Sequence, residues 1–147
     1  MKTRQSGFTI IELIIVILVV GGLTGLVIAS FSSLKQKDRD NERQNDIKTL
    51  HAQVESYFAQ AGKYPTLANL NDEKWRATSM KGLDADVLRD PQALLQALAD
   101  KPAKNVYSYV VKASDDTDCD NNAKDCTKYT LSATYESGGV FTKSNLN

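Results

Sequence analysis

Residues 8–31 have the sequence FTIIELIIVILVVGGLTGLVIASF, and this stretch decides the fold because it holds a single charged side chain, Glu12. Its 24 residues would span about 36 Å as an α-helix, enough to cross the roughly 30 Å hydrocarbon core of a bilayer. A secretory signal peptide usually has a shorter apolar run, of roughly 7–15 residues. A chain of 147 residues also offers no core large enough to bury such a helix. The segment therefore predicts a membrane-spanning helix, whose N-terminus Lys2 and Arg4 keep in the cytoplasm.

The charge pattern changes abruptly after this segment. Residues 35–48 hold nine charged side chains, which predicts passage from hydrocarbon into water. The whole chain has 18 basic and 18 acidic side chains, and loss of Lys2 and Arg4 would leave 16 basic ones. Strong nucleic-acid binding needs clustered basic residues, so we do not expect it here.

A carboxylate deep in a bilayer raises the free energy of membrane insertion by about 2.5–3.5 kcal/mol. Glu12 therefore requires a binding partner or a function that offsets this cost. Cleavage between Gly7 and Phe8 would create an α-amine at Phe8, one helical turn before Glu12 and on the same face. That amine can pair with its own Glu12 or with the Glu12 of a neighbouring chain. Pairing with a neighbour would fix the register of packed helices, because an unpaired charge in a dry interface is penalised.

The first residues also carry a family resemblance. The leader MKTRQSG, followed by FTIIEL and an unbroken apolar run, resembles the class III signal of type IV pilins and type II secretion pseudopilins. The resemblance implies that prepilin peptidase cuts after Gly7, that the same enzyme N-methylates Phe8, and that Glu12 guides entry into a filament. It implies three parts: a cleaved leader (1–7), a transmembrane and filament-core half of a long helix (8–31), and a globular head (32–147) that includes the amphipathic half of the helix.

This helix departs from the family pattern at Ala29, where many relatives carry proline. Gly21, Gly22 and Gly25 precede it. Glycine weakens a helix, so these residues would let it loosen or stretch. Small residues also let membrane helices approach closely, and both roles remain open.

An amphipathic pattern continues the helix beyond Phe31. Apolar residues recur at spacings of three and four from Ile47 to Ala61, and Gly62 and Pro65 then stop the pattern. We therefore expect one helix from about Phe8 to Ala61. The following Gly-Lys-Tyr-Pro turn resembles that of G-type pseudopilins and of pilins close to them.

The remaining chain predicts short helices and then a small sheet. Asp90 before Pro91 predicts an N-capped helix that ends near Asp100, and Trp75 is expected to pack in the core. Residues 106–112, 128–136 and 140–142 alternate or follow turn signals, as strands do. The predicted fold is α+β, a type IV pilin-like ladle with a long N-terminal helix packed against a small antiparallel β-sheet.

Two cysteines, Cys119 and Cys126, flank an acidic stretch. An exported head permits a disulfide between them. Asp116, Asp118 and Asp120 have a spacing that can bind Ca²⁺, and the resemblance implies a calcium loop near the C-terminus in G-type pseudopilins. The calcium pattern is incomplete, because it lacks its turn glycine and its closing glutamate. We therefore expect a solvated, disulfide-closed loop and no cofactor, with a calcium site as the alternative.

No catalytic constellation is recognisable, and we expect His51 to be a surface side chain. The chain is predicted to be a non-enzymatic pilin that forms a helical filament with copies of itself and other pilins, for adhesion, twitching motility or DNA uptake. The expected partners are prepilin peptidase, a pilus assembly platform protein and its ATPase machinery. The expected location is the inner (cytoplasmic) membrane, as a single-pass protein before assembly, and the cell-surface pilus afterwards. The alternative is a G-type-like pseudopilin of a type II secretion system.

Overall fold

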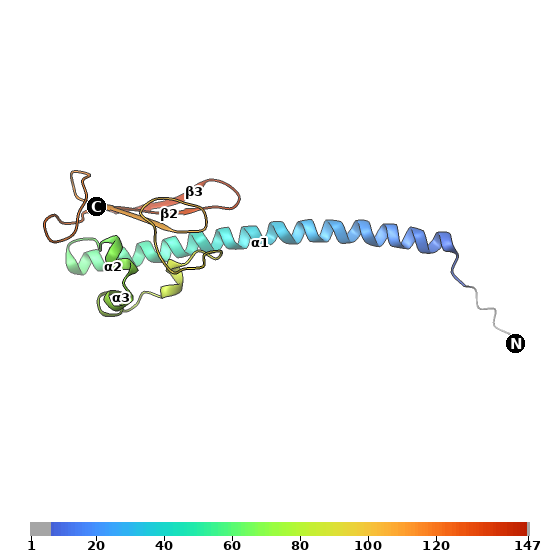
Figure 1. Ribbon diagram of the computed structural model, residues 1–147, viewed down its shortest axis with the longest axis horizontal. Coiled ribbons are helices and arrows are strands. Elements are labelled where there is room, and N and C mark those ends of the chain that lie inside the picture. The colour runs from blue at the N-terminus through green and yellow to red at the C-terminus, as the bar shows by residue number, and fades with distance from the viewer. Residues whose placement is uncertain (1–6, 147) are drawn as a thin grey trace. The chain divides into compact units, whose positions relative to one another are not determined.

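The computed structural model describes residues 7–146, apart from the side chain of Ala29. The predicted leader therefore lies outside the described residues except for Gly7. The chain divides into two compact units, Met1–Lys37 and Asp38–Asn147. Its elements follow the order of one long helix, short helices and three strands (Figure 1).

The long helix α1 extends from Ile10 to Ala61 without interruption (Figure 1). It begins two residues later than Phe8 and ends at the predicted residue. Gly62 follows it with φ +72°, a left-handed conformation that glycine adopts without strain. The Gly62 N–H donates to the Phe58 carbonyl oxygen over 2.7 Å, which closes the last turn.

Within the second unit, α1 buries one stripe of side chains. Ile47, Leu50 and Val54 are fully buried, at the spacing of three and four that the sequence predicts. They pack in one core with the strand residues Tyr109 and Leu131.

Three antiparallel strands form the sheet, β1 (Ser108–Lys112), β2 (Lys128–Thr134) and β3 (Val140–Ser144), in the order β1-β2-β3. Tyr109 lies opposite Leu131, and Ala133 lies opposite Phe141. The alternating side chains of β1 and β2 place their apolar face on the α1 stripe. A long helix with a small antiparallel sheet is the α+β, pilin-like arrangement that the sequence predicts.

Between α1 and the sheet lie α2 (Leu67–Asn71), α3 (Glu73–Ser79) and the 3₁₀-helix η1 (Ala85–Leu88). Trp75 on α3 is partly buried against the core and lies 5.3 Å from the Tyr57 ring, centroid to centroid, as predicted.

The prediction of a helix from Pro91 to about Asp100 is wrong. Residues 91–100 contain turns, bends and an isolated β-bridge from Ala99 to Ser108 instead, and Leu94 is 98% exposed. The Asp90 side chain does accept a hydrogen bond from the Gln92 N–H over 2.9 Å, which is a capping contact. Its carboxylate also binds the buried Arg43, however. Leu94 and Leu95 are exposed, whereas Leu98 packs in the core. The cap begins a turn and not a helix.

Candidate functional site

The first half of α1 exposes apolar side chains on all sides. Phe8 is 82% exposed, and the large apolar side chains from Ile10 to Leu34 are exposed as well. The segment is long and apolar enough to cross a membrane by length and composition, and none of it is buried in the described structure. In water such a surface would be strongly unfavourable, so it indicates a lipid or protein environment.

Glu12 lies in the first turn of α1 and forms a capping box with Thr9. The Thr9 N–H donates to Glu12 Oε2 over 3.4 Å, and the Glu12 N–H donates to Thr9 Oγ1 over 3.3 Å. This reciprocal pair satisfies two N–H groups that a helix start leaves free. Among the ion pairs of residues 7–146, none involves Glu12. Within the described residues, the contact of the Glu12 side chain is this capping bond from Thr9.

Within the described residues, no neighbouring atom excludes a larger side chain at the glycines of the first unit. A Cβ atom built at Gly7, Gly21, Gly22 or Gly25 would meet nothing within 4 Å. α1 passes through the last three without a break. This open space is compatible with both roles of these glycines given above, a looser helix and a close helix–helix approach.

A buried arginine holds the second unit together. Arg43 is fully buried, and its guanidinium binds the Asp90 carboxylate bidentately, with Nε and Nη2 at 2.6 and 3.0 Å. Its Nη1 atom also donates to Asp40 over 2.9 Å and to Glu136 over 2.8 Å. Glu136 accepts two further bonds from Arg39 at 2.6 and 2.7 Å. This arginine cluster joins α1, the loop at Asp90 and the β2–β3 turn.

The contacts of the arginine cluster shift its acid–base equilibria. Hydrogen bonds from Arg39 lower the pKa of Glu136 to about 2. Burial acts to raise the pKa of Asp40, but hydrogen bonds from Ser137 and the Glu136 N–H outweigh it and lower that pKa. Burial acts to lower the pKa of Arg43, but its bonds to Asp90 and Glu136 raise it. These shifts favour the charged forms of Glu136, Asp40 and Arg43 at neutral pH.

His51 is half-buried rather than the surface side chain predicted. Its Nδ1 atom lies 2.7 Å from the Tyr129 hydroxyl oxygen, and that hydroxyl donates to Glu55 over 2.7 Å. Tyr64 also donates to Glu55, over 3.2 Å. Burial lowers the pKa of His51, although Glu55 acts in the opposite direction. The arrangement connects α1 to β2 and carries no nucleophile.

Cys119 and Cys126 form the expected disulfide, with Cα atoms 5.2 Å apart. The loop that it closes is fixed to the turn after α1 through Asn121. The Asn121 side chain donates to the Tyr64 carbonyl oxygen over 2.7 Å and accepts from the Cys126 N–H over 2.9 Å. The Tyr64 N–H in turn donates to the Cys126 carbonyl oxygen over 2.8 Å.

The structure does not bring the three candidate calcium ligands together. Asp116 pairs with Lys128 over 2.9 Å, and Asp118 pairs with Lys112 over 2.6 Å. Asp120 accepts hydrogen bonds from backbone N–H groups of its own loop, including Ala123 over 2.8 Å. No group of three or more metal-ligating side chains occurs among the described residues.

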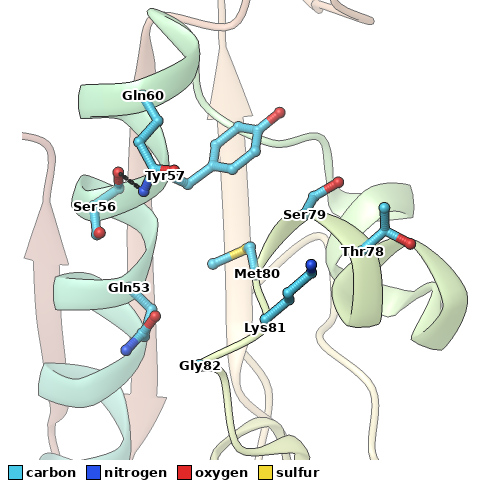
Figure 2. A pocket seen from close by; sticks show the side chains of 9 residues that line it. All are labelled: Gln53, Ser56, Tyr57, Gln60, Thr78, Ser79, Met80, Lys81 and Gly82. Atoms are coloured by element: carbon cyan, nitrogen blue, oxygen red, sulfur yellow. Dashed lines mark hydrogen bonds between the residues drawn. The ribbon is translucent and has the colours of Figure 1, made fainter.

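A polar groove of about 500 Å³ lies between the end of α1 and the end of α3 (Figure 2). It is lined by Gln53, Ser56, Tyr57, Gln60, Thr78, Ser79, Met80, Lys81 and Gly82. Figure 2 shows the Tyr57 ring extending from α1 toward the α3 wall, with Lys81 on that opposite wall. The groove and the arginine cluster were both missed by sequence reasoning, because their members come from separate elements and share no local pattern.

These features define a class, an α+β subunit with an unpartnered apolar N-terminal helix. The chain is 32% identical over 66 residues to the type IV major pilin protein PilA of Myxococcus xanthus, covering 45% of this chain and 30% of that protein. It is 35% identical over 66 residues to the type II secretion system core protein G of Dickeya chrysanthemi, covering 45% and 43%. It is 35% identical over 65 residues to the same protein of Aeromonas hydrophila, covering 44% and 46%.

The predicted resemblance is therefore confirmed: the chain is similar to type IV pilins and type II secretion pseudopilins. It spans less than half the length of these curated relatives. Their names are those of structural subunits, which agrees with the prediction that the chain is not an enzyme. No family model matches the chain, and no solved structure does.

Proposed function

We propose that the chain is a type IV pilin, a structural subunit that polymerises through the first half of α1. The observation that carries the proposal is the exposed apolar surface from Ile10 to Leu34, which nothing in the described chain covers. Before assembly, lipid of the inner membrane covers this surface. After assembly, the same helix of neighbouring subunits covers it, and the heads form the cell-surface pilus.

Processing prepares the helix for this exchange. Prepilin peptidase cuts between Gly7 and Phe8 and methylates the new amine. The Phe8 amine then pairs with Glu12 of a neighbouring subunit, for which the absence of an ion pair at Glu12 within residues 7–146 gives support. An assembly platform protein and its ATPase machinery drive polymerisation, and the filament serves adhesion, twitching motility or DNA uptake.

Mass spectrometry of the native protein and electron microscopy of the cells test this proposal. We expect a chain that begins at methylated Phe8, and long surface filaments that contain it. Glu12→Ala should insert into the membrane but assemble poorly. An intact Met1, a start near Ser30, or normal filaments of the Glu12 variant would each contradict a part of the mechanism.

The second candidate is a pseudopilin of a type II secretion system. Its support is that the matched relatives include core protein G from several bacteria. The Cys119–Cys126 loop near the C-terminus favours a pilin instead. Deletion of the gene distinguishes them: loss of surface filaments supports the pilus, whereas loss of enzyme secretion with filaments intact supports the pseudopilin.

A further inference from the structure

The polar groove offers many hydrogen-bonding groups that the folded chain leaves unused. Its two carboxamides, on Gln53 and Gln60, each carry both donors and an acceptor. Gln60 uses one donor, toward the Ser56 carbonyl oxygen over 3.2 Å. Within residues 7–146, the Gln53 amide and the Tyr57 hydroxyl make no hydrogen bond. A ligand with several hydroxyl groups would find both donors and acceptors here.

The groove carries a single positive charge and no negative charge among its lining residues. Lys81 is its one charged lining residue, and no carboxylate lines it. Lys81 takes part in none of the ion pairs among the described residues. An uncompensated ammonium group beside neutral polar groups selects a ligand that carries an anionic group.

The walls of the groove are held in place. Tyr57 packs against Trp75 at a centroid distance of 5.3 Å, and Trp75 in turn packs on the core. The Gln53 amide lies against Gly82, where an added Cβ would stand 3.8 Å from Gln53 Oε1. A fixed aromatic ring beside amide groups presents a flat apolar surface together with polar ones.

Other ligand classes fit this geometry less well. An extended peptide needs a free sheet edge or an apolar groove, whereas helices and a turn line this groove. A nucleic acid needs several clustered cations, and Lys81 stands alone. The size of the groove, about 500 Å³, lies within the range of small-ligand sites.

We propose that the polar groove binds an acidic saccharide, with Gln53, Gln60 and the Tyr57 hydroxyl contacting sugar hydroxyls and Lys81 contacting a carboxylate. The Tyr57 ring lies against the sugar ring. This site lies wholly within the second unit, so it does not depend on whether the filament is a pilus or a pseudopilus.

The test uses the full chain in micelles of a detergent that has no sugar headgroup. Equilibrium dialysis measures binding of a labelled galacturonic acid tetramer, a neutral glucose tetramer and an acidic peptide. Fluorescence of Trp75, the one tryptophan of the chain, reports whether binding occurs beside Tyr57. We expect saturable binding of the acidic tetramer, with affinity about tenfold above that of the neutral one.

Three variants with unchanged circular dichroism locate the site. Lys81→Met should reduce the affinity for the acidic tetramer about tenfold and leave the affinity for the neutral tetramer unchanged. Gln53→Leu should reduce the affinity for both tetramers about fivefold, because both lose a hydrogen-bonding partner. Lys74→Met removes an exposed charge of α3 outside the groove and should change neither affinity.

The proposal is overturned if the acidic tetramer does not bind saturably, or if Lys74→Met weakens it as much as Lys81→Met. Equal affinity for acidic and neutral sugars would refute the role of Lys81. Tighter binding of the peptide than of either sugar would assign the groove to a different class of ligand and refute the proposal as a whole.

Discussion

Replacing Arg43 with methionine removes the centre of the arginine cluster. The three carboxylates of the cluster then keep different numbers of hydrogen-bond partners. Glu136 keeps its two bonds from Arg39, at 2.6 and 2.7 Å. Asp40 keeps the N–H group of Glu136, at 2.9 Å. Asp90 loses both guanidinium bonds, and its side chain is 1% exposed. Its remaining contact is the Gln92 N–H at 2.9 Å, so Asp90 becomes a nearly unpaired buried charge.

The expected cost follows from this asymmetry. Removing one partner of a buried ion pair typically lowers the free energy of unfolding by about 3–5 kcal/mol. We expect Arg43→Met to fall in this range, because Asp90 has no solvent to replace the guanidinium. In the double variant Arg43→Met with Asp90→Leu, the free energy of unfolding should rise by about 2–3 kcal/mol relative to Arg43→Met alone, because the unpaired Asp90 carboxylate is then absent.

Urea unfolding of the full chain in detergent micelles measures these differences, with Trp75 fluorescence as the signal of the second unit. Arg89→Met is the matched control, because Arg89 is half-exposed and lies 3.8 Å from Asp86. An exposed pair of this kind contributes at most about 1 kcal/mol. A cost below about 1 kcal/mol for Arg43→Met, or a double variant that equals the sum of its singles, would refute the reasoning.

Three further predictions concern acid, the disulfide and metal. As the pH falls from 4.5 toward about 2, the unfolded chain binds a proton at Glu136 before the folded chain does, so the melting temperature should fall in this window. An unchanged melting temperature down to pH 2 would contradict the ion pairing with Arg39. Replacing Cys119 and Cys126 with serine should cost about 2–3 kcal/mol in urea unfolding, because the unfolded chain gains freedom; an equally stable variant would contradict this. Adding a chelator should leave the melting temperature of the purified chain unchanged, and a large drop would instead support the calcium alternative.

Local patterns were enough to predict much of the fold. The apolar run and the three-and-four spacing of Ile47, Leu50 and Val54 predicted α1, and alternation predicted the strands. These signals work because each depends on neighbouring residues in one element. The cleavage motif around Gly7 and Glu12 is local in the same way, and its function stays a prediction.

Long-range contacts could not be predicted in this way. Residues 35–48 have the composition of a solvated surface, yet Arg43 within them is fully buried. Its partners Asp90 and Glu136 lie 47 and 93 residues further along the chain.

The arginine cluster also sets an order of events during synthesis. Asp40 accepts the N–H groups of Glu136 and Ser137, which follow it by 96 and 97 residues. At a translation rate of roughly 5–20 residues per second, the ribosome adds these residues about 5–20 seconds after Asp40. During that interval water must hydrate Asp40 and Arg43, so the nascent head cannot complete its packing. The head can therefore complete its packing only after the hairpin of β2 and β3 has been translated.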